Sequence, residues 1–241
     1  MHELGRVALA FLICGGLSAC GGVTQSDEAT HDGAVLYLNF EGALLEYGAH
    51  NDAALSVTTL GDGPGPYQAQ RAELARFMDG DAPTRALVIE QVVRSVRGIY
   101  APFALDVVSQ RPQQGEFTMV VVGNTFGEIQ FADACPLAGL AVRDCQGDSL
   151  GDVGFVAAGC MPADWSPAQA RSYLARTIAH EAGHTFGLSH NANQASLMSQ
   201  ASTGFSLEKG PVPAEDQASC QRTTQDDFAV LRQVLGLRGE R

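Results

Sequence analysis

The stretch His180-Glu181-Ala182-Gly183-His184-Thr185-Phe186-Gly187-Leu188-Ser189-His190 decides both the fold and the chemistry of this chain. His180 and His184 are four residues apart, so on a helix both imidazoles project from one face and can bind one ion. Gly187 can adopt the positive φ that ends a helix, which lets His190 return to the same ion. A catalytic zinc ion takes three protein ligands and keeps one position open. The stretch therefore predicts a zinc site on these three histidines, with Glu181 beside it as general base.

Residues 180–190 match in full the signature HExxHxxGxxH, so this segment resembles the metzincin zinc peptidases. Metzincins have a Met-turn beneath the metal, and Ala195–Ser199 resembles it, with Met198 eight residues after His190. The short spacing and the run Gly187–His190 are most similar to the matrixin branch. No histidine lies between residues 51 and 179, so a matrixin-like structural zinc is not expected. The sequence therefore predicts a single zinc ion, the catalytic one.

The resemblance implies a zinc-dependent endopeptidase, in which a zinc-activated water hydrolyses peptide bonds with Glu181 as general base. It also implies that an extended protein or peptide substrate pairs with an edge strand, expected at Asp152–Ala157, and that Phe205 walls the main side-chain pocket. One alternative is a catalytically degenerate metzincin domain that acts as an exported binding module. The intact Glu181 argues against that alternative. A hydrolase acting on non-peptide amides would share the same site.

The charge of the chain limits its partners. The 241 residues carry a formal net charge of −12, with 45% hydrophobic and 17% charged residues. Nucleic-acid binding relies on Lys and Arg that neutralise phosphates, so it is not expected, and neither is binding to anionic lipid through basic patches. The composition is that of a chain with an ordinary core.

The N-terminus is interpreted as a processing segment, residues 1–19. Arg6 precedes the short apolar run Val7–Cys14, which is typical of a signal peptide and too short to span a bilayer. Leu17–Cys20 resembles the lipobox of bacterial lipoproteins, which predicts a lipid anchor on Cys20 followed by a flexible tether over residues 20–34. The protein is then exported and anchored to a bacterial membrane, the outer one where two membranes are present. An ordinary signal peptide cleaved after Ala19 is the alternative.

Four cysteines remain after Cys14 and Cys20, an even number that suits two disulfides in an exported protein. They are Cys135, Cys145, Cys160 and Cys220. Three pairings are open, and the most natural joins Cys135 to Cys145 and Cys160 to Cys220. The carboxylates of Asp144, Asp148 and Asp152 could bind Ca²⁺, although they lack an EF-hand pattern and fit a solvated loop better.

The remaining pattern predicts one α/β (α+β) domain over residues 35–241, a metzincin-like domain with a mixed, mostly parallel twisted sheet. Strands are expected at Val35–Phe40, Ala104–Ser109, Phe117–Val122 and Asp152–Ala157, and loops at 48–66 and 123–150. Helices are expected from Pro83 to Tyr100, with Pro83 in the first turn, and from Ser166 to Gly187, the active-site helix. A C-terminal helix should open with a capping box of Thr224 and Asp227.

Overall fold

The computed structural model describes residues 33–200, 204–215 and 220–240 of the chain. The expected signal peptide, Cys20 and all but the last two residues of the tether lie outside these residues and stay predictions. In the described ranges no helix is long and apolar enough to cross a membrane.

Five strands form the central sheet in the order β5-β1-β6-β8-β7. They are β1 (Ala34–Asn39), β5 (Leu105–Val108), β6 (Thr118–Gly123), β7 (Gly139–Ala141) and β8 (Val153–Ala157). The pairs β1–β5, β1–β6 and β6–β8 are parallel, whereas β7 runs antiparallel to β8. The prediction of an α/β chain with a mixed, mostly parallel sheet is confirmed.

The edge strand is not the expected one. The predicted edge, Asp152–Ala157, corresponds to β8, which is fully buried and lies between β6 and β7. The edge strand is β7, which comes from the stretch 123–150 expected to be loop. A three-residue strand containing Gly139 and no β-branched residue is too short for a recognisable alternation, so the sequence pattern misses it.

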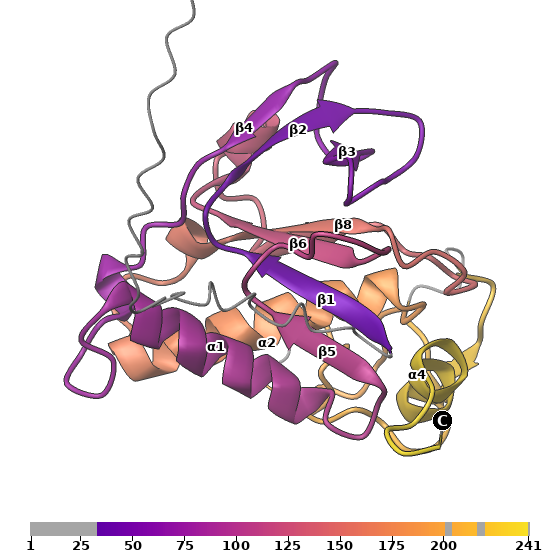
Figure 1. The fold of residues 1–241 in the computed structure, drawn as a ribbon. Helices are drawn as coiled ribbons and strands as arrows, with labels where there is room; N and C mark the ends of the chain where they lie inside the picture. The colour runs from indigo at the N-terminus through magenta and orange to yellow at the C-terminus, as the bar shows by residue number, and fades with distance from the viewer. Residues whose placement is uncertain (1–32, 201–203, 216–219, 241) are drawn as a thin grey trace, which may run out of the picture. The chain divides into compact units, whose positions relative to one another are not determined.

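Both faces of the central sheet are covered, as Figure 1 shows. Successive side chains of a strand point to opposite faces, so β1 feeds two cores. Leu36 and Leu38 belong to the core shared with the helices α1 (Arg85–Ile99) and α2 (Pro167–Thr185). Val35 and Tyr37 belong to the core on the other face, under the small sheet of β2 (Ala43–Tyr47), β3 (Val57–Thr58) and β4 (Tyr67–Ala69). The active-site helix α2 therefore lies directly against the sheet.

The helix ends follow local capping rules. Thr84 caps α1 by accepting a hydrogen bond from Leu87 N, so Pro83 lies one residue before the cap and not in the first turn. Ser166 and Gln169 form a capping box at the start of α2. The C-terminal helix α4 (Asp227–Leu235) is capped by Asp226, which corrects the predicted box of Thr224 and Asp227. Thr224 instead pairs in β10 (Thr224–Gln225) with β9 (Val212–Pro213).

Short 3₁₀ turns complete the described chain: η1 (Ala75–Phe77), η2 (Phe126–Ile129) and η3 (Ala158–Cys160). Within the expected loops, η2 and β7 interrupt 123–150, and β3 interrupts 48–66.

Two disulfides form, but with a different pairing from the expected one. Cys135 joins Cys160 and Cys145 joins Cys220, with Cα–Cα distances of 5.2 Å in both. The expected bond between Cys135 and Cys145 does not form, and β7 lies between these two cysteines in the chain. The antiparallel pairing of β7 with β8 instead brings Cys135 next to Cys160.

Candidate metal centre

His180 and His184 project from one face of α2 near its C-terminal end. Their ring centroids are 4.8 Å apart and both side chains are buried. The helix ends after Thr185, and Gly187 follows with φ of 90°. A left-handed residue at this point is favourable for glycine and turns the chain back. The turn is closed by Leu188 N, which donates to Gly183 O at 2.9 Å.

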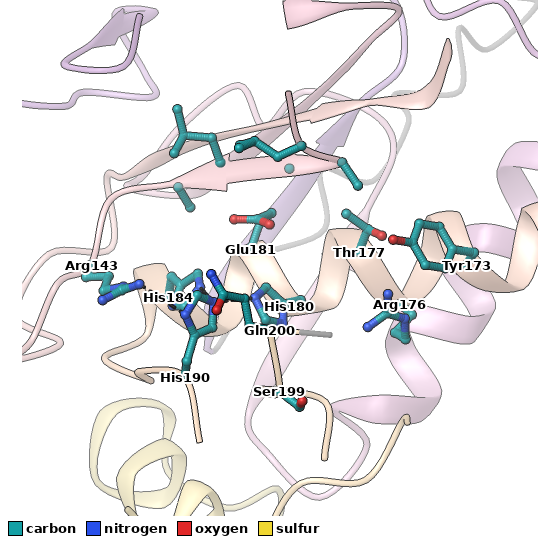
Figure 2. Close-up of a pocket in the computed structure, with 15 residues that line it drawn as sticks. Arg143, Tyr173, Arg176, Thr177, His180, Glu181, His184, His190, Ser199 and Gln200 are labelled. Atoms are coloured by element: carbon teal, nitrogen blue, oxygen red, sulfur yellow. Dashed lines mark hydrogen bonds between the residues drawn. The ribbon is translucent and has the colours of Figure 1, made fainter. Parts of the chain in front are cut away.

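The reversed chain brings His190 against the other two rings (Figure 2). His190 Nε2 lies 3.1 Å from His180 Nε2 and 3.2 Å from His184 Nε2. Nitrogens at about 2.0–2.1 Å from a tetrahedral zinc ion are separated by about 3.3 Å, so this arrangement fits a zinc ion. Among the residues that the structure describes, these histidines are the only His, Cys, Asp or Glu group close enough to share an ion.

Backbone carbonyls fix two of the rings. His180 Nδ1 donates to Leu197 O at 2.7 Å, and His184 Nδ1 donates to Leu188 O at 2.8 Å. A carbonyl can only accept, so Nδ1 carries the proton and Nε2 keeps its lone pair for a metal. Burial lowers the pKa of His180 to about 4 and that of His184 well below its usual value, so both rings are neutral near pH 7.

The third ring has a different neighbour. Arg143 Nη2 lies 3.2 Å from His190 Nδ1 and belongs to the loop between β7 and β8. The Arg143 charge also contributes to lowering the pKa of both His180 and His184. Arg143 therefore adds a positive charge beside the histidine group.

Met198 lies beneath α2. It is fully buried, and a Cβ atom at Gly183 would stand only 2.7 Å from its sulfur. Only glycine at position 183 lets the methionine approach the helix so closely. Asn191 N donates to Met198 O at 3.1 Å, which ties the segment after the third histidine to this turn.

Glu181 lies next to His180, turned toward the sheet (Figure 2). Burial raises the pKa of its carboxyl to about 8, an effect that Arg143 and Arg176 partly oppose. Strand β7 passes very close to it, because a Cβ atom at Gly139 would lie 2.4 Å from Glu181 Oε1. A desolvated carboxyl of raised pKa is well suited to accept and return a proton.

A pocket of about 370 Å³ joins these groups. One wall is the stretch Leu137–Ala141, which contains β7, and the opposite side is α2 with the three histidines and Glu181. Of the described residues after Met198, Ser199 and Gln200 line the pocket; Phe205 does not, and it is 42% exposed. The volume is in the range of sites that bind small molecules or part of a peptide.

The acidic residues considered for calcium do not form a site. Asp144 accepts backbone hydrogen bonds from Gly147 and Ser149, so its oxygens are engaged in its own loop. Burial, together with Asp144 and Asp148, raises the pKa of Asp152 to about 7. The described residues thus give the calcium hypothesis no support.

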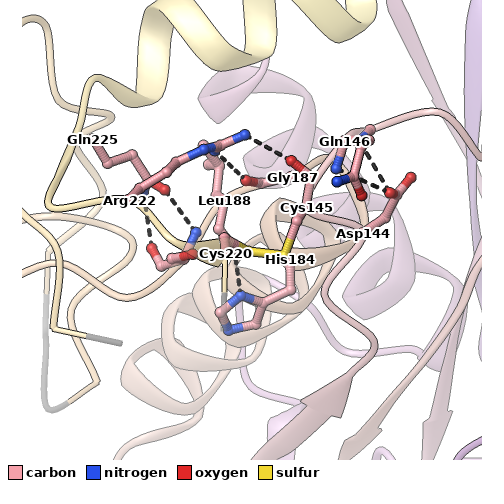
Figure 3. The surroundings of a disulfide bond; sticks show 11 residues. Asp144, Cys145, Gln146, His184, Gly187, Leu188, Cys220, Arg222 and Gln225 are labelled. Carbon is pink, nitrogen blue, oxygen red and sulfur yellow. Dashed lines mark hydrogen bonds between the residues drawn. A yellow bond between two sulfur atoms is a disulfide. The ribbon is translucent and has the colours of Figure 1, made fainter. Parts of the chain in front are cut away.

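Figure 3 shows how the disulfide of Cys145 and Cys220 lies beside the end of α2. Arg222 donates to Gly187 O at 2.8 Å and to Cys145 O at 2.7 Å. Asp144 N donates to His184 O at 3.2 Å. The disulfide therefore joins two segments that both contact the turn between the second and third histidines. Two disulfides are typical of an extracytoplasmic protein.

Sequence reasoning places His180, Glu181, His184, His190 and Met198 in one site, and the structure brings them together. It does not single out Gly139, Arg143 or Arg176. Arg176 alone had a usable signal, because it precedes His180 by four residues and so shares its helix face. The others come from distant segments.

Comparisons with known proteins give weak similarities. No protein-family model and no curated protein matches the sequence. Among solved structures, the chain is similar to archaemetzincin from Methanopyrus kandleri, at 13% identity and a TM-score of 0.35, covering 71% of this chain and 82% of that one. It is also similar to the ECX AB5 holotoxin in its GM1-bound form, at 15% identity and a TM-score of 0.37, covering 88% and 84%. The chemistry of the site has to be derived from its own residues.

Proposed function

We propose that this chain is a zinc-dependent endopeptidase of the metzincin type, with His180, His184 and His190 as the metal ligands. The observation that carries the proposal is the convergence of three imidazole Nε2 atoms, two of their separations being 3.1 and 3.2 Å, with Glu181 one residue from the first ligand. The HExxHxxGxxH pattern and the position of Met198 beneath the helix, as a Met-turn, support the metzincin type, and the eight-residue spacing from His190 to Met198 with the run Gly187–His190 favours the matrixin-like branch.

Zinc, when bound, supplies a Lewis acid that makes water more acidic and polarises a carbonyl group. The protein holds the ligands for it: Leu197 O and Leu188 O orient two rings, and the turn at Gly187 delivers the third. A buried cluster of this kind keeps its geometry because two of the rings are fixed by packing and by a hydrogen bond to a backbone carbonyl.

Glu181 is the proton carrier. Its carboxylate takes a proton from the attacking water and returns it to the leaving nitrogen of the scissile bond. Gly139 leaves room for this carboxylate between β7 and α2, and the apolar surroundings raise its affinity for the proton.

The substrate is an extended polypeptide that pairs with β7. This strand is one of the two outer strands of the central sheet, and residues Leu137–Ala141 line the pocket on the side of Glu181. A peptide added along an edge strand gains backbone hydrogen bonds and presents alternate side chains to the pocket. The expected pairing with Asp152–Ala157 is thereby moved one strand outward.

We further propose that residues 35–241 form the catalytic domain of an exported protein, lipid-anchored through Cys20 after removal of residues 1–19. Metabolic labelling with a fatty-acid analogue tests the anchor, with Cys20→Ser as control. Equal labelling of both proteins would remove Cys20 as the lipid attachment site.

Metal analysis combined with digestion of an unfolded protein tests the main proposal. The purified protein should contain about one zinc ion per chain, lose cleavage after removal of the metal by a chelator, and regain it when zinc is returned. Bound zinc without cleavage would favour the exported binding module instead. A protein that takes up no zinc would contradict both functions.

A further inference from the structure

A buried positive charge lies in the pocket without an acidic partner. Arg176 is on α2 one turn before His180, lines the same pocket and is only 7% exposed (Figure 2). Its Nε atom has no hydrogen-bond partner, and no carboxylate of the described residues lies within 4.0 Å of the guanidinium. A buried guanidinium without an anion is costly, so such a group in a substrate pocket calls for a ligand.

Arg171, five residues earlier on the same helix, shows how the fold treats an arginine that has only a structural role. It is also 7% exposed, yet it forms an ion pair with Asp79 at 3.0 Å and donates to Phe77 O at 2.6 Å. The two arginines lie on one helix and are equally buried. Arg171 forms an ion pair with a carboxylate, whereas Arg176 forms none.

The surroundings of Arg176 orient its charge but do not neutralise it. The guanidinium lies 4.5 Å from the centre of the Tyr173 ring, which in turn packs edge-to-face against Trp165. Stacking on an aromatic face fixes the plane of the guanidinium and gives a modest attraction. Burial lowers the pKa of Arg176, and Tyr173 together with the more distant Glu181 offsets only part of this effect.

A second polar atom that lines the pocket is also unsatisfied. Thr177 Oγ1 is buried without a hydrogen-bond partner, and Thr177 lines the same pocket. A guanidinium donates two parallel hydrogen bonds to a carboxylate. Arg176 therefore presents donors suited to one planar anion.

We propose that Arg176 forms a subsite for a substrate carboxylate, so that the enzyme selects peptides with an acidic group at one fixed position relative to the scissile bond. This inference rests on the proposed peptidase function and names its substrate class. The carboxylate is supplied either by an Asp or Glu side chain or by a free C-terminus. Both sources offer the same planar anion.

Paired peptides test the subsite without any change to the protein. Peptides that are identical except for Glu or Gln at successive positions, each with a free or an amidated C-terminus, are compared for cleavage. Their binding is measured by fluorescence anisotropy on the zinc-loaded Glu181→Gln protein, which keeps them intact. One acidic position should improve both binding and kcat/KM by about 10-fold to 100-fold. A gain from Glu identifies a side-chain carboxylate, and a gain lost on amidation identifies the C-terminus.

Variants assign the preference to Arg176. Arg176→Gln should remove it, Arg176→Lys should keep part of it, and the matched control Arg171→Gln should lower stability while leaving the Glu-to-Gln ratio unchanged. Equal binding of every acidic and amide pair by the protein with the native Arg176, or a preference that survives in Arg176→Gln, would overturn the inference. A binding preference with no cleavage would reject the peptidase function and leave the carboxylate subsite standing.

Discussion

The polar groups beneath the histidines and those facing the pocket are both buried, but only the first set is internally satisfied. Beneath the histidines, Asp227 is fully buried and accepts hydrogen bonds from Gln225 at 2.7 Å, Glu208 N at 3.1 Å and Ser196 at 3.3 Å. In the pocket, Arg176 Nε and Thr177 Oγ1 have no partner, and Glu181 is desolvated. We call these two sets the floor and the pocket face.

This difference distinguishes the groups that hold the histidines in place from the groups that face the substrate. A satisfied polar network in a low-dielectric interior is rigid and can hold ligands in place. Unsatisfied groups cost stability and persist where a substrate or a reaction step completes them. One hydroxyl oxygen of the floor, Ser189 Oγ, also has no hydrogen-bond partner. The difference in hydrogen bonding between floor and pocket face therefore applies to their charged groups and not to every hydroxyl.

The largest expected effect comes from Glu181 on the pocket face. Glu181→Gln should lower kcat/KM by about a thousandfold, because general acid–base catalysis contributes about 10²–10⁴. Zinc content and thermal stability should stay close to those of the wild type, since the glutamine keeps the shape of the side chain. Peptide hydrolysis and metal analysis on the same preparations check this. A variant that loses zinc would mean that Glu181 supports the metal site instead.

A stability comparison between the two sets should give opposite signs. Asp227→Ala leaves the donors of Gln225 and Ser196 unsatisfied and should cost about 3 kcal/mol in the free energy of unfolding. Thr177→Val removes a buried hydroxyl that has no partner and should be neutral or slightly stabilising. Urea unfolding measures both. A loss at Thr177 as large as that at Asp227 would erase the distinction between floor and pocket face.

The two disulfides should differ in what they control. Replacing Cys145 and Cys220 by alanine opens a loop with a sequence separation of 75 and should cost about 4 kcal/mol, against about 3 kcal/mol for Cys135 and Cys160 with a separation of 25. Only loss of the first pair should also weaken zinc binding, because Arg222 and Asp144, which lie beside its two cysteines in the chain, contact the turn that positions His190. Unfolding curves and zinc titration separate the two effects, and equal zinc affinity in both variants would refute the coupling.

Gly139 tests the pocket face from the side of the sheet. Gly139→Ala places a Cβ atom 2.4 Å from Glu181 Oε1, so the carboxylate must move, and we expect activity to fall by about 10-fold to 100-fold with zinc content unchanged. Gly127→Ala is the control, because its Cβ atom would lie 3.5 Å from Thr125 Oγ1, an ordinary van der Waals contact. Full activity of Gly139→Ala would show that the position of Glu181 is not critical.

The smallest effect concerns Asp152, a buried carboxyl outside both sets whose Oδ2 also lacks a partner. Its folded pKa of about 7 lies above the unfolded value of 3.8, so the folded state binds the extra proton between these values and stability falls as the pH rises from about 4 to 7. We expect a loss of about 1 kcal/mol, reduced by solvent screening of the exposed carboxylates nearby. Asp152→Asn should flatten this slope in unfolding measurements, and an unchanged slope would assign it to other groups.

Much of the fold was accessible from local patterns. The helix α1 follows from apolar periodicity, although its cap Thr84 was missed, α2 follows from the cap Ser166, and β1, β5, β6 and β8 follow from runs of β-forming residues. The edge strand β7 was not accessible, because three residues give no period. The disulfide pairing failed for the same reason, since it depends on where β7 lies.

The sequence by itself determined which residues form the candidate metal centre, the three histidines and Glu181, because the spacing within residues 180–190 fixes which side chains share a helix face and where a glycine can turn the chain. Only the tertiary structure decided what surrounds them. The pairing of β7 with β8 places Gly139 over Glu181, the packing of α4 places Asp227 in the floor, and the burial of α2 leaves the Arg176 charge unpaired. Such contacts join segments far apart in the chain, and no local spacing encodes them.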